Sequence, residues 1–420
     1  MYQLRKLKLN GKAINSLNIS IPLLMGIFLF FNPFPHTTTI KEICFYLSAF
    51  IVLLLLVFKK TAFSFKTPLS IPFTLFVLWS FFGLFFALDK PNSIHDFYAH
   101  LLKYLAFYYL LVNFFNTKKR LGVLIWIIIL SAAAFSTWAI TYFYFFLGND
   151  IATQLGLGFT EIPINIIGIV TLFAIILSLY LFRQVTNVYR KTFLVICLII
   201  TSLATLLTQT RGTLLAMVFS LTILSLKNKK VLMVFTVSLL IAIAFLPVRH
   251  RLNMENIINK LRDDPRTGIA YNFIEVIKDY PITGIGFGMQ TYADEKLLDK
   301  YNARVPTNYR QPIAYKAPHN LLIDVAVRLG LVGLVLYLYI IFAFIQMGWK
   351  KIKYGKDDFI RSWGRCLMAA FVAVFIQGMF ENTHSGPPAI VLYAILAMMT
   401  ILWRLNMKSD NQLDIKSAPG

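Results

Sequence analysis

The stretch IPINIIGIVTLFAIILSLYLF, from Ile162 to Phe182, decides the fold. It contains no charged residue, and as a helix it is long enough to cross the ~30 Å hydrocarbon core of a membrane. Because the hydrocarbon core holds no water, each backbone N–H and C=O must be paired within its own segment. The stretch is therefore expected to be a transmembrane helix, and Arg183 directly after it begins a positively charged loop.

Apolar blocks of similar length recur along the whole chain. Hydrophobic residues make up 58% of the 420 positions and charged residues 14%, whereas about 25% are charged in an average soluble protein. We predict an all-α polytopic membrane protein with about twelve transmembrane helices and one large loop that contains short helices. The expected spans are residues 17–32, 41–58, 69–87, 99–115, 121–147, 162–182, 192–208, 212–226, 231–247, 319–346, 363–380 and 387–404.

The net charge of +22 does not indicate nucleic-acid binding, because the positive residues lie in short clusters between the apolar blocks. These clusters alternate with loops that hold few positive residues, namely Lys41, Lys90, Lys103 and Arg211. The positive-inside rule places the clusters and both termini in the cytoplasm. The clusters fall within residues 5–12, 59–66, 118–120, 183–191, 227–230, 350–365 and 404–416.

One loop on the opposite, outer side is much longer than the others. It comprises residues 248–318, between nine spans in residues 1–247 and three in residues 319–404, and loops of this length are usually functional or disordered. Residues 405–420 are expected to form a short, disordered cytoplasmic tail.

The large loop holds aromatic residues, glycines and charges of both signs. Its segment from Gly268 to Tyr280 places four apolar residues at helical spacing, which predicts a short amphipathic helix near the membrane surface. The four residues are Ile269, Phe273, Ile274 and Ile277.

The strongest local signal is His319-Asn320, at the junction of the large loop and the tenth span, followed by Gly330-Leu331-Val332-Gly333. An imidazole in the first turn of a helix on the outer side can accept a proton from a hydroxyl at neutral pH or orient that hydroxyl. Gly330 and Gly333 would let another helix approach closely. The alternative is an interfacial histidine at a helix cap beside two packing glycines.

Arg211 lies in the short outer turn Thr208-Gln209-Thr210-Arg211-Gly212. A positive charge at membrane depth is costly, and a bound anion would offset that cost, since arginine can bind phosphate oxygens through two hydrogen bonds. The alternative is that Arg211 extends toward lipid headgroups.

Arg266 lies in the large loop, and the segment Pro281–Gly288 downstream is rich in glycine. This segment follows no strand of a βαβ unit, so a dinucleotide site is not expected and a tight turn is favoured. By itself Arg266 would be an ordinary solvated loop charge. No metal-ligand cluster is apparent, and the cysteines Cys44, Cys197 and Cys366 are interpreted as small buried residues.

Several other polar residues lie near the outer ends of the expected spans. Lys103 and His100 lie in or beside the fourth span, where an intramembrane lysine is a functional candidate and an interfacial one is not. Asp324 and Arg328, four residues apart, could pair on one helix face. Glu381 and His384 in the last outer loop are weaker candidates.

Taken together, these features resemble the O-antigen ligase and polymerase superfamily of bacterial envelope biogenesis. The turn at Arg211 resembles the family's Arg-Gly turn, and Arg266 followed by a helix and Pro281–Gly288 resembles its loop signature. His319-Asn320 with Gly330 and Gly333 resembles the ligase signature itself. Family members often carry an acid just before the first of these glycines, where this chain has Arg328 nearby.

The resemblance implies a metal-independent, inverting glycosyltransferase without cofactors, at the periplasmic face of the inner membrane. The donor would be a polysaccharide on undecaprenyl diphosphate and the acceptor a sugar hydroxyl of lipid A–core, both reached through the membrane lipids. His319 would be catalytic, with Asn320, Gly330 and Gly333 supporting it. Arg211, Arg266 and Lys103 would bind the diphosphate, since cationic side chains stabilise the departing charge.

Other functions remain open at this stage. An O-antigen polymerase and a protein O-oligosaccharyltransferase belong to the same superfamily. A transporter of lipid-linked glycans is less favoured, because transporters place their sites near the membrane midplane, whereas the polar candidates of this chain gather on the outer side.

Overall fold

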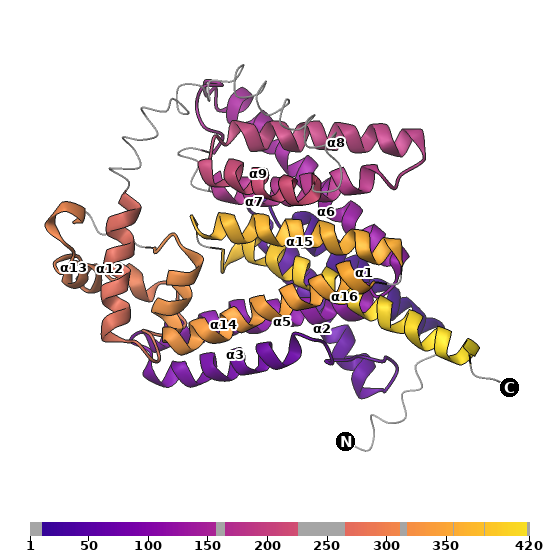
Figure 1. The fold of residues 1–420 in the computed structure, drawn as a ribbon, viewed down its shortest axis with the longest axis horizontal. Coiled ribbons are helices and arrows are strands. Elements are labelled where there is room, and N and C mark those ends of the chain that lie inside the picture. Colours follow the sequence, from indigo (N-terminus) through magenta and orange to yellow (C-terminus); the bar gives the residue numbers. More distant parts are fainter. Residues whose placement is uncertain are drawn as a thin grey trace.

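The computed structural model describes residues 11–156, 164–225, 265–310, 317–355, 357–381 and 383–417. Within these ranges the regular elements are all helices. The long helices form a bundle, with α12 and α13 at one end, which we call the loop end (Figure 1). The C-terminal part of α16 points toward the opposite end (Figure 1). The expected all-α membrane architecture is confirmed.

The long helices follow the apolar blocks of the sequence. They are α1 (Gly11–Phe31), α2 (Thr38–Val57), α3 (Ser70–Gly83), α5 (Lys103–Phe114), α6 (Lys118–Ile140), α7 (Ile164–Phe182), α8 (Val188–Leu207), α9 (Arg211–Ser225), α14 (Leu321–Tyr354), α15 (Asp358–Gly378) and α16 (Gly386–Ser417). The shorter elements are α4 (Lys90–Asp96), the π-helical stretches η3 (Phe97–Leu102) and η4 (Thr141–Phe146), α12 (Pro265–Asp279), α13 (Glu295–Asn302) and the 3₁₀ turns Leu84–Phe86, Thr291–Ala293 and Thr307–Tyr309.

Seven helices among the described residues are long and apolar enough to cross a membrane, and three shorter apolar helices accompany them. Every expected span except 231–247 coincides with one of the helices. Residues 231–247 lie outside the described residues, so the number twelve is not confirmed.

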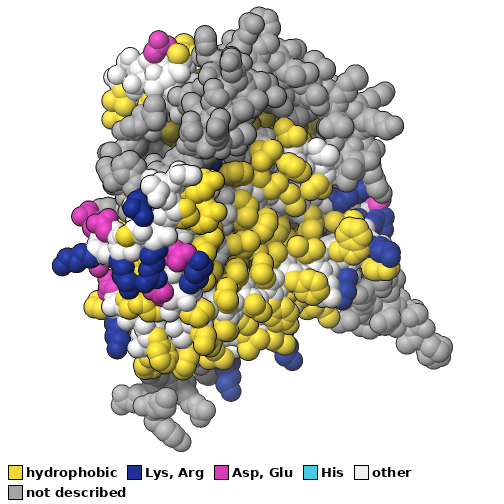
Figure 2. Space-filling model, turned by 60° about the vertical axis from the view of Figure 1, so that its left-hand side comes forward, with side chains coloured by type: hydrophobic (Ala, Val, Ile, Leu, Met, Phe, Trp, Pro, Cys, Tyr) yellow, Lys and Arg dark blue, Asp and Glu magenta, His cyan; other side chains and the backbone are white. Residues whose placement is uncertain are grey.

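The flank of the bundle is apolar. Figure 2 shows a broad area of hydrophobic side chains, with lysine and arginine gathered toward its two ends. Exposed side chains on this flank and elsewhere include Leu53 of α2, Ile199 of α8 and Phe342 of α14. An exposed apolar surface of this extent requires lipid around it. By contrast, α7 is apolar on every face and is buried among α6, α8, α9, α15 and α16.

The large loop contributes α12, α13 and a small apolar core of its own. Ile269 and Phe273 of α12 pack there with Leu298 of α13 and with Val327 of α14. The predicted amphipathic helix is therefore present, but the buried face differs from the predicted one. Val276 is buried, while Ile274 is 39% exposed. The difference arises because α13 and the start of α14 cover α12, and the sequence pattern within α12 does not show where they lie.

Helix α14 is broken at Gly330, whose backbone has φ 69° and ψ −175°. Across the break, Leu331 N–H donates to the carbonyl of Pro281 at 2.8 Å, and a Cβ on Gly330 would lie 2.0 Å from the carbonyl oxygen of Ile282. A Cβ on Gly333 would meet Leu329 of the same helix. The expectation that these glycines admit another helix is therefore wrong, because loop backbone is what approaches Gly330.

The break also changes the tenth span. An unbroken helix of the 34 residues of α14 would be about 51 Å long, well beyond the ~30 Å of a hydrocarbon core. The break separates the buried first part, Leu321–Leu329, from the long apolar part that follows. The span expected at residues 319–346 is thus interrupted, because backbone hydrogen bonds to the loop replace helical ones.

Two smaller expectations are settled by the described residues. Cys44, Cys197 and Cys366 are free and buried, as predicted. Helix α16 continues to Ser417, so the expectation of a disordered tail after Arg404 is wrong over that part.

We expect Gly330→Ala to destabilise the protein by at least about 2 kcal/mol, because this backbone conformation is nearly restricted to glycine and the loop must also move. Thermal unfolding in detergent measures the effect. The control is Gly122→Ala in α6, where a Cβ meets no atom within 4 Å. Equal melting temperatures of the two variants would contradict the role assigned to Gly330.

Candidate functional site

Three side chains from separate segments meet at the loop end. Nδ1 of His319 lies 3.2 Å from Oε2 of Glu381, and Nη2 of Arg266 lies 3.9 Å from Oε1 of the same carboxylate. His319 precedes α14, Arg266 begins α12, and Glu381 follows α15. The His319 and Arg266 side chains are 35% and 46% exposed, so a ligand can reach both.

Asn320 fixes the backbone next to His319. Its side-chain oxygen caps α14 by accepting from Leu322 N–H at 3.0 Å and Ile323 N–H at 3.1 Å. Its amide nitrogen donates to the carbonyl of Met379 at 3.2 Å, which ties the start of α14 to the end of α15. His319 therefore lies before the helix, and the expectation that it occupies the first helical turn is wrong.

His319 also has an uncommon backbone conformation. Its φ of 47° lies in the left-handed region, which costs a residue with a side chain free energy. Neighbouring contacts, including those of Asn320, must hold this conformation. Such backbone strain is concentrated at functional sites, and here it aims the imidazole at Glu381.

The turn that carries Arg211 approaches the same region at Phe380. Helix α8 ends at Leu207 and α9 begins at Arg211, so the short turn expected there is present. A Cβ on Gly212 would lie 3.3 Å from Cδ2 of Phe380, and the Arg266 guanidinium carbon stands 5.4 Å from the centre of the same ring. Gly212, which follows Arg211, and the Arg266 guanidinium are thus both next to Phe380. Arg211 is exposed and forms no ion pair with any residue that the structure describes.

Lys103 has a different environment. It begins α5, where its ammonium forms an ion pair with Glu42 of α2 and lies 5.6 Å from the centre of the Phe45 ring. Its side chain is only 15% exposed. Lys103 is therefore already neutralised by a carboxylate, unlike Arg211.

A buried ionic network lies directly beneath the exposed cluster. Asp324 and Arg328, with 0% and 3% of their surfaces exposed, pair at 3.4 Å, as their spacing predicted. Tyr292 O–H donates to Asp324 Oδ1 at 3.0 Å, and Nε2 of His384 lies 3.3 Å from Asp324 Oδ2. Arg328 Nε donates to the carbonyl of Phe287 at 2.8 Å, and its guanidinium carbon stands 4.2 Å from the centre of that ring.

Burial determines the protonation states in this network. It lowers the pKa of His384, against the raising effect of the Asp324 carboxylate, so His384 is neutral at pH 7. Burial and then the same carboxylate raise the pKa of Tyr292 well above its usual range, so its hydroxyl stays a donor. The network joins the large loop, the start of α14 and the segment between α15 and α16.

The glycine-rich segment pairs with the backbone of α14. Ile285 N–H donates to the carbonyl of Val327 at 2.9 Å, and Gly286 N–H donates to that of Arg328 at 3.1 Å. A Cβ on Gly284 would lie 2.4 Å from the carbonyl carbon of Arg328. The glycines therefore serve this close packing, beyond the tight turn that was favoured, and these two N–H groups are already hydrogen-bonded.

Glu381 and Phe380 connect the site, yet sequence reasoning gave Glu381 little weight and did not select Phe380. Both lie outside any local motif, and their partners are far away in the chain. Asn320 bonding to Met379 and Gly212 packing on Phe380 place them at the site. The only local indication of a site there was the presence of Glu381 and His384 in a short outer loop.

Comparison with known proteins gives one family match. A family model described as O-antigen ligase matches residues 194–338, which run from within α8 into α14. The matched region contains Arg211, Arg266, His319, Gly330 and Gly333, while Lys103 and Glu381 lie outside it. No curated protein matches the chain.

We expect Arg328→Met to destabilise the protein by about 3–5 kcal/mol, because it leaves the buried Asp324 carboxylate without its cation. Adding Asp324→Asn should recover much of the loss. Thermal unfolding in detergent measures both, with Lys278→Ala, which breaks an exposed ion pair, as the near-neutral control. A melting temperature of Arg328→Met close to that of the control would show that the network is not structural.

Proposed function

The chain belongs to the O-antigen ligase superfamily, and we propose that it transfers a polysaccharide from undecaprenyl diphosphate to a sugar hydroxyl of lipid A–core. The observation that carries this proposal is the His319–Glu381 pair beside Arg266, with Gly212, the residue after Arg211, packed against Phe380. A histidine–carboxylate pair can activate a hydroxyl, and two arginines can bind a diphosphate.

In this proposal the loop end faces the periplasm and the bundle lies in the bacterial inner membrane. The alternation of positive clusters supports that orientation and a cytoplasmic location of both termini. The apolar flank in Figure 2 would give both lipid-anchored substrates access from the bilayer.

His319 acts as the base in the proposed reaction. With Nδ1–H donating to Glu381, Nε2 carries the lone pair that accepts the proton of the acceptor hydroxyl. The hydroxyl oxygen bonds to the anomeric carbon of the donor, and the bond from that carbon to the diphosphate oxygen breaks. A single displacement of this kind inverts the anomeric centre. Glu381 orients the imidazole and stabilises its protonated form.

Arg211 and Arg266 stabilise the departing diphosphate. Arg211 is exposed and the Arg266 side chain is 46% exposed, so phosphate oxygens can reach both guanidinium groups. Two such cations stabilise the additional negative charge that develops on the leaving group, so the proposal invokes no metal. Lys103 would bind the diphosphate only if its ion pair with Glu42 were broken.

Asn320, Gly330 and Gly333 support the site in this proposal by shaping α14. Asn320 caps the helix next to His319, and Gly330 leaves room for the loop backbone at Ile282 to pack against α14. Together they hold the imidazole where three chain segments meet.

The direct test is transfer by the purified protein in the presence of EDTA, with an undecaprenyl diphosphate-linked glycan as donor and rough lipopolysaccharide as acceptor. The expected product carries the glycan on lipid A–core with inverted anomeric configuration. Extension of the donor glycan without lipid A–core would instead identify a polymerase, and loss of transfer in EDTA would overturn the metal-independent mechanism.

We expect His319→Ala to lower kcat by about 10²–10⁴-fold, the usual contribution of a general base. Glu381→Gln keeps the size of the side chain but removes its charge, and it should lower kcat less severely. Glu275→Gln, which affects an exposed ion pair on α12, is the matched control. Transfer by His319→Ala at the wild-type rate would disprove the assignment.

Loss of either arginine should slow transfer at least about tenfold, because a charge-assisted hydrogen bond to phosphate contributes roughly 1.5–3 kcal/mol. Arg211→Lys should restore activity only in part, since lysine keeps the charge but lacks the planar guanidinium. Kinetics of Arg211→Ala, Arg266→Ala and Arg211→Lys measure this. Arg304→Ala, which breaks an exposed pair with Asp279, should be close to wild type, and equal effects at all three arginines would argue against a specific diphosphate site.

A further inference from the structure

A cavity lies inside the bundle, next to the proposed reaction site. Side chains from α3, α5, α14, α15 and α16 line it, and most of them are apolar or aromatic. Apart from tyrosines, its polar lining consists of His100, Arg328, Thr383 and His384. The remaining wall includes Phe76, Tyr337, Ile340, Leu392 and Leu396.

The segment between α15 and α16 separates this cavity from the exposed cluster. Glu381 faces His319 and Arg266, whereas Thr383 and His384, two and three residues later, line the cavity. The polar end of the cavity and the proposed catalytic base are thus on the two sides of one short segment.

The lining residue Thr383 has a buried hydroxyl that a ligand could satisfy. Its side chain is fully buried, and its hydroxyl has no hydrogen-bond partner among the described residues. A buried hydroxyl without a partner is unfavourable, and a carbonyl or hydroxyl of a bound molecule would relieve it.

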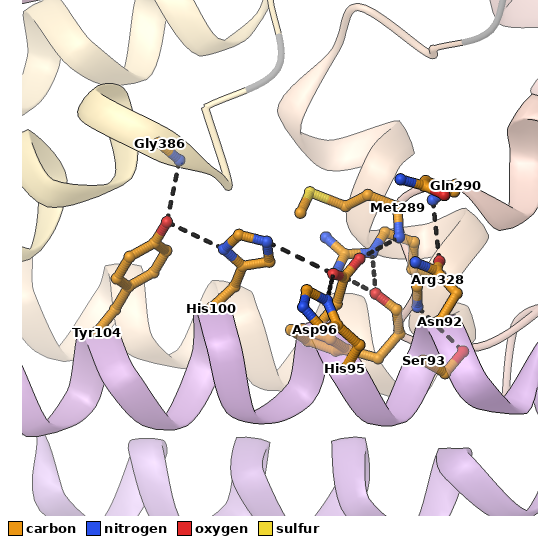
Figure 3. A network of polar contacts seen from close by, with 12 residues as sticks. Asn92, Ser93, His95, Asp96, His100, Tyr104, Met289, Gln290, Arg328 and Gly386 are labelled. Atoms are coloured by element: carbon orange, nitrogen blue, oxygen red, sulfur yellow. Dashed lines mark hydrogen bonds and ion pairs between the residues drawn. The ribbon is translucent and has the colours of Figure 1, made fainter. Parts of the chain in front are cut away.

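The electrostatics of the polar end disfavour a diphosphate. Asp96 Oδ2 accepts from Met289 N–H at 2.7 Å, and His100 Nε2 lies 3.5 Å from Asp96 Oδ1 (Figure 3). His100 Nδ1 in turn lies 3.1 Å from the hydroxyl of Tyr104, which accepts from Gly386 N–H at 3.0 Å (Figure 3). The histidine is thereby hydrogen-bonded to Tyr104 through Nδ1, and its Nε2 faces the Asp96 carboxylate.

The one guanidinium at this end is also occupied. Arg328 is paired with Asp324 and with the carbonyl of Phe287. Two buried carboxylates, Asp96 and Asp324, therefore accompany a single arginine, so the surroundings carry no excess of positive charge. A neutral polar group fits here, and a diphosphate does not.

We propose that this cavity binds an acyl chain of the glycolipid acceptor, with the chain along the apolar wall and its ester or amide carbonyl at Thr383. The inference rests on the proposed function, in which the donor diphosphate occupies Arg211 and Arg266 on the other side of the segment. An acyl chain anchored in the cavity would bring the sugars of the same lipid to His319.

Kinetics with separate variation of the two substrates test the proposal. Leu392→Trp fills the cavity and should raise the KM for rough lipopolysaccharide about tenfold or more without changing the KM for the donor. Thr383→Val removes only the hydroxyl and should raise the acceptor KM by about three- to tenfold, without loss of thermal stability. The control is Val335→Trp on the exposed side of α14, where the residue is 63% exposed.

Binding without turnover separates this inference from the proposed function. Native mass spectrometry of the full chain in detergent should show that Leu392→Trp weakens binding of rough lipopolysaccharide but not of its fully deacylated form. If this pattern appears without any transfer activity, the proposed function fails and the cavity assignment stands. If both variants leave the acceptor KM unchanged, or if Leu392→Trp raises the donor KM instead, the acyl-chain assignment is overturned.

Discussion

Asp324 and Arg328 form an ion pair that is almost wholly removed from solvent, and the surrounding structure depends on how that pair is satisfied. Burying two charges is costly unless their remaining hydrogen-bonding groups find partners. Tyr292 and Phe287 of the large loop supply some of these partners, and His384 supplies another. The pair therefore joins three segments that are far apart in the chain, because each must be in place for the charges to remain buried.

The same first part of α14 that carries the pair also carries His319 and Asn320 at its start. The break at Gly330 makes this part a separate element, which can dock against the loop instead of continuing the span. Loop backbone takes over hydrogen bonds there, at Leu331, Ile285 and Gly286. The imidazole is thus positioned by a short buried helix held on several sides, which suits a site that must be rigid at the membrane surface.

The segment between α15 and α16 divides the polar residues into two groups of different charge. Phe380 and Glu381 lie beside the exposed Arg266, while Thr383 and His384 lie against the apolar cavity. The proposed reaction between two lipid-anchored molecules would use both environments, one for the diphosphate and one for the other lipid.

The sequence by itself determined the membrane class and the positions of most helices, and it selected Arg211, Arg266 and His319 as the candidate site residues. These depend on the length of apolar blocks and on short motifs, which are local properties of the chain. The pairing of Asp324 with Arg328 was also predictable, because residues four apart share a helix face.

Only the tertiary structure decided that Glu381 bridges His319 and Arg266, that Lys103 pairs with Glu42, and that Gly330 breaks a helix against loop backbone. It also decided which face of α12 is buried and placed Phe380 next to both Arg266 and Gly212. Each of these depends on contacts between residues far apart in the chain, and neither composition nor periodicity within one segment specifies which segment lies opposite it.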